Sequence, residues 1–126
     1  MASISKGRLW AGYAMSGLPA LALLASAGMK LANVLAVQEG FAHLGWPPNV
    51  IFGLGLVELT CFVLYLVPAT SVLGAILVTG YLGGAMATHL RIGEPFIGPL
   101  LLGVLAWGGL YLRTPQLQAL IPRLLR

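Results

Sequence analysis

Three ionisable side chains, Lys30, Glu58 and His89, lie inside or at the ends of strongly apolar stretches of the chain. Burying such a group is costly unless it has a partner, so each one indicates a functional site. A carboxylate can exchange a proton, an amine can hold the carboxylate in its charged form, and an imidazole can donate to a carbonyl, hydroxyl or epoxide oxygen. Together these residue types predict acid–base chemistry in an apolar environment.

The composition indicates where this chemistry takes place. Of the 126 residues, 59% are hydrophobic and only 8% are charged, and the mean hydropathy is +0.93. Soluble domains carry about 25% charged residues, so a water-soluble fold is excluded and the natural solvent is a bilayer. The net charge of +4 is typical of basic flanks on membrane helices rather than of nucleic-acid binding. The single cysteine, Cys61, excludes an internal disulfide.

Apolar runs bounded by prolines and charges predict an all-α membrane protein, a four-transmembrane-helix up-down bundle in one domain over residues 1–126. The spans are expected at about 9–31, 49–67, 71–90 and 96–112, with a long loop over 33–46 and a short amphipathic surface helix over 114–126.

The basic residues predict the orientation of this bundle. Arg91 is expected on one side of the membrane. Five basic residues are expected on the other side, namely Lys6, Arg8, Arg113, Arg123 and Arg126. The positive-inside rule therefore places both termini in the cytoplasm. The loop over 33–46 is then extracytoplasmic.

Helical periodicity indicates how the charged residues meet. Ser26, Lys30 and Asn33 share the semi-polar stripe of the first helix. From a rise of about 1.5 Å per residue, Glu58 lies roughly 14 Å below the outer boundary and Lys30 roughly 5 Å below it. We therefore predict an ion pair between Lys30 and Glu58. The alternatives are a lysine that snorkels to the surface and a glutamate that makes a structural interhelical hydrogen bond.

The third helix carries two small residues, Gly80 and Gly84, on one stripe. Such a stripe permits close packing, here on the fourth helix or on another copy of the chain. His89 then points toward a central cavity, or lies simply at the polar end of its helix. We expect Glu39, Glu94 and His43 to be solvated and Arg91 to pair with Glu94 in the turn. The two histidines lack the spacing of a metal site.

Four segments that are separated in the sequence together carry a resemblance to a known family. They are Ser26–Lys30, Phe41–Pro47, Gly55–Leu59 and Tyr81–Gly93. Over about residues 12–120 the chain resembles the DoxX-like family of small four-helix bacterial membrane proteins. The resemblance implies a place in the bacterial cytoplasmic membrane and a shared polar signature of Lys30, Glu58, His89 and Arg91. It also implies links to thiosulfate:quinone oxidoreduction, to thiol redox partners or to receptor assembly, although one cysteine does not support thiol redox.

The leading hypothesis is a pocket in the outer half of the bundle for a quinone-like or isoprenoid-like small molecule. The expected catalytic residues are Glu58, Lys30 and His89. The expected substrate-binding residues are Arg91, Ser26, Asn33, Cys61, Phe62 and Tyr81. This set of residues fits two kinds of chemistry. One is quinone-linked redox, with quinone as the cofactor, and the other is cofactor-free isomerisation, epoxide opening or cyclisation. One alternative is a non-catalytic assembly subunit. Another is a transporter, but the inner half of the bundle lacks charged side chains, and this disfavours a transport path.

Overall fold

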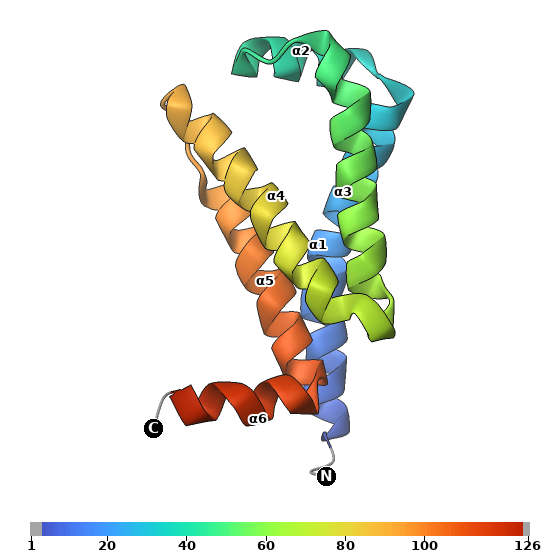
Figure 1. The fold of residues 1–126 in the computed structure, drawn as a ribbon, viewed down its shortest axis with the longest axis vertical. Coiled ribbons are helices and arrows are strands. Elements are labelled where there is room, and N and C mark those ends of the chain that lie inside the picture. Colours follow the sequence, from blue (N-terminus) through green and yellow to red (C-terminus); the bar gives the residue numbers. More distant parts are fainter. Residues whose placement is uncertain (1–3, 125–126) are drawn as a thin grey trace.

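The computed structural model describes residues 4–124, except for the side chains of residues 122–124, and these residues form helices and turns without strands (Figure 1). The helices are α1 (Lys6–Ala32), α2 (Leu35–Leu44), α3 (Ile51–Leu66), α4 (Ser71–Arg91), α5 (Ile97–Arg113) and α6 (Pro115–Leu124), with short 3-10 turns at Pro48–Val50 and Pro68–Thr70. The four predicted spans correspond to α1, α3, α4 and α5, and the predicted C-terminal helix is α6. Arg126 and the side chain of Arg123, which entered the charge count, lie outside the described residues.

Three segments are long and apolar enough to cross a membrane, namely Lys6–Ala32, Pro48–Leu66 and Pro68–Arg91. Helix α5 has 17 residues and passes the same test only together with α6, from which it is bent by 106°. The fold is therefore an all-helical membrane protein with three to four spans. Large apolar side chains on its outside, such as Leu21 at 73% exposure, fit contact with lipid.

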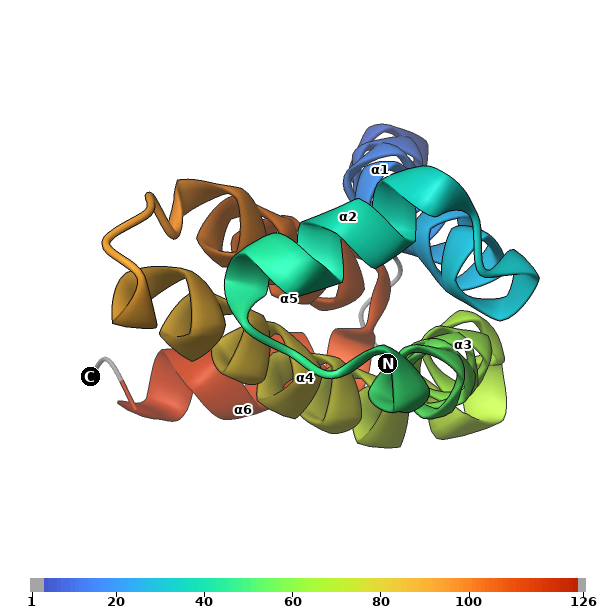
Figure 2. The same ribbon diagram turned by 90° about the horizontal axis from the view of Figure 1, so that it is seen from above.

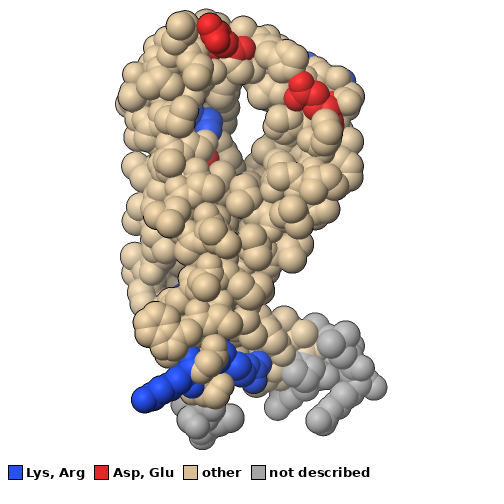
Figure 3. All heavy atoms as spheres, turned by 180° about the vertical axis from the view of Figure 1, so that it is seen from behind, with Lys and Arg blue, Asp and Glu red and all other residues tan. Residues whose placement is uncertain are grey.

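The four long helices form a ring in which α1 packs against α3 and α5, and α4 packs against the same two helices. The pairs α1–α3 and α4–α5 converge toward the end that holds both termini and diverge toward the other end (Figure 1). Helix α2 crosses over the diverging end from one pair toward the other (Figure 2). Basic side chains gather at the converging end (Figure 3).

Glycines explain why the helices converge at one end only. A Cβ on Gly74 would lie 2.2 Å from the Tyr65 nitrogen, and one on Gly109 would lie 2.3 Å from Ser16 Oγ. Only glycine permits these close approaches, which lie at the converging end. Added Cβ atoms at Gly80 and Gly84 would meet nothing within 4 Å. The prediction that these two glycines pack on the fourth span is therefore wrong, while packing on a second copy stays a prediction.

The predicted loop over 33–46 is in fact mostly the helix α2. Asn33 ends α1 in the left-handed conformation with a φ of 53°, and its carbonyl accepts a hydrogen bond from Gln38 Nε2 at 2.8 Å. Gly45, with a φ of 81°, closes α2, and the Trp46 N–H donates back to the Phe41 carbonyl. A helix of ten residues depends on such caps and on tertiary contacts rather than on a long apolar pattern. The sequence pattern therefore missed it.

The converging end contains a buried polar network that the sequence did not predict. Tyr65 is fully buried, and its hydroxyl donates to the Ala106 carbonyl at 2.6 Å and lies 2.9 Å from Ser16 Oγ. Arg113 Nε donates to the same Ser16 oxygen at 3.1 Å, and its guanidinium lies 5.3 Å from the centre of the Tyr65 ring. Tyr65 is thus a core residue. The network closes the bundle at this end.

Candidate functional site

The predicted ion pair between α1 and α3 is present. Lys30 Nζ lies 2.7 Å from Glu58 Oε2. The Glu58 side chain is fully buried, whereas that of Lys30 keeps 11% exposure. Gly55 lies one turn before Glu58, and a Cβ there would lie 2.9 Å from Lys30 Cβ, so a glycine brings the two helices close enough for the pair. Lys30 therefore does not snorkel to the surface.

Two further side chains complete the network around Glu58. Lys30 Nζ donates to Ser26 Oγ at 2.6 Å, and Ser26 Oγ donates to Glu58 Oε2 at 3.3 Å. Tyr81 on α4 donates its hydroxyl hydrogen to the same Oε2 at 3.1 Å. Glu58 Oε1 is buried without a hydrogen-bond partner among the residues that the structure describes. Three donors on one oxygen offset part of the cost of burying this carboxylate, while its other oxygen stays unpaired in the described part of the chain.

A cavity of about 510 Å³ lies between the two helix pairs, next to this network and beneath α2. Figure 3 shows an opening between the pairs, with acidic and basic side chains in its wall. The cavity is lined by Lys30, Phe41, Leu44, Trp46, Val50, Leu54, Gly80, Tyr81, Gly84, Ala85, Thr88 and His89. Most of this lining is apolar or aromatic, with a few polar groups, as in sites for small molecules.

Lys30 has hydrogen-bonding capacity left for this cavity. An ammonium group has three N–H donors, and the described contacts of Lys30 use two of them, on Ser26 and Glu58. Glu58 itself is not in the cavity wall, since Lys30 and Tyr81 stand between it and the open space. Lys30 and Tyr81 are therefore the lining residues that connect the cavity to Glu58 by hydrogen bonds.

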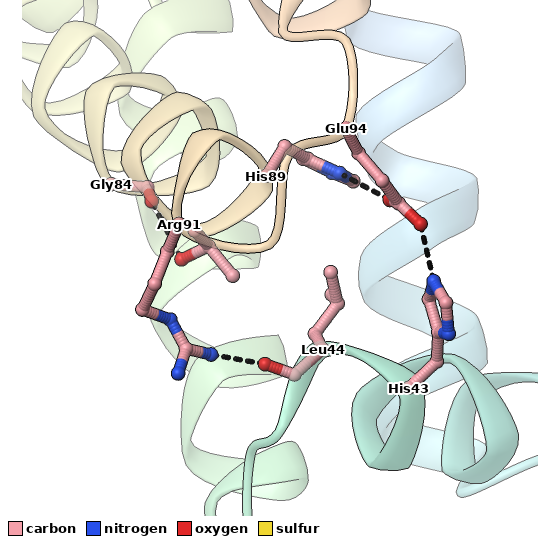
Figure 4. A network of polar contacts seen from close by, with 7 residues as sticks. His43, Leu44, Gly84, His89, Arg91 and Glu94 are labelled. Carbon is pink, nitrogen blue, oxygen red and sulfur yellow. Dashed lines mark hydrogen bonds and ion pairs between the residues drawn. The ribbon is translucent and has the colours of Figure 1, made fainter.

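The rim of the cavity holds a second polar network, which joins α2 to the end of α4 (Figure 4). Glu94 contacts His43 Nε2 through Oε1 and lies 3.2 Å from His89 Nδ1 through Oε2. Hydrogen bonds from His43 and then from His89 lower the pKa of the Glu94 carboxyl. The His43 and Glu94 side chains are 65% and 35% exposed, so they are solvated as predicted, but they also contact each other. The prediction that Arg91 pairs with Glu94 is wrong, because Arg91 contacts another element.

Arg91 instead reaches across to α2. Its guanidinium donates to the Leu44 carbonyl, at the C-terminus of α2 where a cation is favourable. The same group lies 6.0 Å from the centre of the Trp46 ring and lines a shallow hollow beside the cavity. Arg91 thus positions the helix that covers the cavity.

The structure does not bring every predicted binding residue to the cavity. Cys61 and Phe62 are buried in the core between the helices, and Asn33 is exposed where it caps α1. None of the three lies in the cavity wall. Ser26 reaches the site only through its hydrogen bonds to Lys30 and Glu58.

Some lining residues were not predicted as site residues. Phe41, Leu44 and Trp46 come from α2 and the turn after it, a segment for which the sequence pattern predicts a loop. The signal was present, because the segment Phe41–Pro47 is one of the four that carry the family resemblance. Further lining residues without a predicted role are Val50, Leu54, Ala85 and Thr88.

Fold and site define a multi-pass helical membrane protein with a buried lysine–glutamate pair next to a largely apolar cavity. The chain belongs to the DoxX-like family, which it matches over residues 14–109. This range contains Lys30, Glu58, His89 and Arg91, the polar signature that the resemblance implied. No curated protein and no solved structure matches the chain.

Proposed function

We propose that the protein binds a lipophilic small molecule, quinone-like or isoprenoid-like, in the cavity beneath α2. The observation that carries this proposal is the remaining Lys30 donor in the wall of a mainly apolar space of about 510 Å³. A lipophile would reach this space from the bilayer and place an acceptor oxygen against Lys30. Its apolar part would contact Phe41, Trp46 and Leu54, and the buried area would supply most of the affinity.

The same geometry supports acid–base chemistry on the bound molecule. Lys30 and Tyr81 both contact the cavity, and both hydrogen-bond to Glu58. As a proton moves to an oxygen of the ligand, Glu58 would hold the compensating charge in a site with little water. This step suits cofactor-free isomerisation or ring opening, and it also suits the proton side of quinone-linked redox.

Filling the cavity tests the proposal. Gly84 lines the cavity and has nothing within 4 Å of an added Cβ, so Gly84→Phe occupies the space without a backbone clash. Gly53→Phe is the matched control, because Gly53 has equal room on the exposed face of α3. Native mass spectrometry of protein purified from membranes should detect a lipophilic adduct on the wild type and on the control, and at least a tenfold smaller fraction on Gly84→Phe. Equal adduct on all three chains would contradict the proposal.

A second candidate, a non-catalytic assembly subunit, has its own observation. A groove of about 600 Å³ runs between α4, α5 and α6, with Gly83, Gly103 and Leu117 among its lining residues. Small residues on a membrane-facing groove favour close packing of another helix. Under this alternative, Gly83→Phe lowers the yield of a stoichiometric partner that co-purifies with the chain, while Gly84→Phe leaves that yield unchanged.

A further inference from the structure

His89 belongs to the polar network at the rim and also lines the cavity. Its side chain lines the cavity, and its Nδ1 faces Glu94 Oε2 at 3.2 Å. The other ring nitrogen, Nε2, has no hydrogen-bond partner within residues 4–121, whose side chains are described. One side of this imidazole is therefore engaged by protein, and the other remains available to a bound molecule.

Glu94 determines which ring nitrogen of His89 carries the hydrogen. An ionised carboxylate only accepts hydrogen bonds, so a nitrogen that bonds to it must be the donor. Glu94 uses Oε1 for His43 and Oε2 for His89. Both rings therefore donate to it, His43 through Nε2–H and His89 through Nδ1–H. In the neutral ring of His89, Nε2 is then left as an acceptor.

The other charged groups near the rim do not disturb this arrangement. Arg91 on α4 is turned to the Leu44 carbonyl, and Lys30 on α1 is held by Glu58 and Ser26. His43 on α2 takes the second oxygen of Glu94 and leaves the first to His89. The Glu94 carboxylate thus accepts hydrogen bonds from two imidazole rings, one on each of its oxygens.

We propose that Glu94 is a positioning residue that holds the neutral ring of His89 with Nε2 as an acceptor, and that this nitrogen accepts a hydrogen bond from a hydroxyl group at the rim end of the ligand. The inference rests on the proposed function and deepens it, because it names the chemistry of the ligand at a second point. It also reverses the expected role of His89, which accepts a hydrogen bond from the ligand rather than donating one.

The two polar ends of the cavity define the ligand class further. Tyr81 stands beside the Lys30–Glu58 pair, and His89 lies eight residues further along α4, a rise of about 12 Å. A matching lipophile has an acceptor oxygen at its inner end and a hydroxyl about 12 Å away. The class is therefore a hydroxylated lipophile with a second oxygen, such as a hydroxy ketone.

A spectrum of the two histidines tests the positioning role without any ligand. Nitrogen-15 NMR of the purified protein distinguishes the two tautomers, and His43→Gln assigns the signals. We expect His89 with its hydrogen on Nδ1 and His43 with its hydrogen on Nε2. Glu94→Gln should release His89 from this tautomer, because an amide can also donate to Nδ1. The matched control is Glu39→Gln, an exposed carboxylate on α2, and it should change neither signal. A wild-type His89 with its hydrogen on Nε2 would overturn the inference.

A pair of probes tests the ligand chemistry. The first is an ω-hydroxy methyl ketone whose extended chain spans about 12 Å, and the second is its methyl ether, which lacks the hydroxyl donor. We expect the hydroxy compound to bind the wild type roughly tenfold more tightly, and Glu94→Gln to reduce this preference. Equal binding of both probes would overturn the inference and leave the proposed function standing. If neither probe binds and the purified protein carries no lipophilic adduct, the proposed function itself fails.

Discussion

The most direct energetic prediction concerns the removal of the amine from the buried ion pair. Lys30→Met keeps the length and apolar stem of the side chain but leaves Glu58, which is 0% exposed, without its cation. Ser26 and Tyr81 still donate to Oε2, and Oε1 already lacks a partner in the described part of the chain. Breaking a buried pair on one side costs about 3–5 kcal/mol. Since two donors remain, we expect a loss near the lower limit, about 3 kcal/mol.

The assay is unfolding in mixed detergent micelles, with the free energy of unfolding measured for the wild type and for each variant. Lys6→Met is the matched control, because Lys6 is exposed at the start of α1, and it should change the free energy by less than about 0.5 kcal/mol. In a cycle with Glu58→Gln, the double variant should lose less than the sum of the two single variants, because the charges act as a pair. A loss below about 0.5 kcal/mol for Lys30→Met, or strict additivity, would refute the reasoning.

Three further predictions address the packing of the helices, the buried polar network at the converging end and the rim of the cavity. Gly74→Ala should destabilise the chain by about 1–3 kcal/mol, because its Cβ would collide with the backbone of Tyr65, whereas Gly80→Ala should be neutral or slightly stabilising in the same unfolding assay. Tyr65→Phe removes the donor to the Ala106 carbonyl and should cost about 1–2 kcal/mol, and an unchanged unfolding free energy would contradict this role. Hydrogen bonds from two histidines lower the pKa of Glu94. The contacts of Glu94 at the rim therefore stabilise the fold at pH values above the ordinary carboxyl pKa. This stabilisation is lost as the pH falls through the lowered pKa. Amide hydrogen exchange in α2, corrected for intrinsic rates, should therefore show less protection on acidification, and Glu94→Gln should remove that pH dependence.

The sequence predicted the ion pair because its parts obey local rules. Helical periodicity placed Lys30 and Ser26 on one stripe, and the cost of a charge in an apolar environment demanded a partner for Glu58. The helix boundaries were equally accessible, since prolines, glycines and charges interrupt each apolar run. These signals depend on residues that are close in sequence or on a single contact between neighbouring helices.

The cavity and its rim depend on information that no local pattern contains. The helix pairs diverge because close glycine contacts exist at Gly74 and Gly109 but not at Gly80 or Gly84. Sequence alone does not show which of these glycines meets another backbone. His43 and Glu94 are 51 residues apart, and they meet only because α2 crosses the open end of the bundle. The role of α2 as a cover therefore became visible only in three dimensions.

The measurement that tests the central claim most directly is photo-crosslinking of a lipophile inside the membrane. An isoprenoid alcohol that carries a diazirine would be equilibrated with the protein in lipid nanodiscs, irradiated, and located by mass spectrometry of the peptides. We predict that the labels fall on residues of the cavity wall, such as Phe41, Leu54 and Ala85, and that Gly84→Phe abolishes them. Labels confined to lipid-facing residues such as Leu21, and unaffected by Gly84→Phe, would contradict a ligand site beside the buried ion pair.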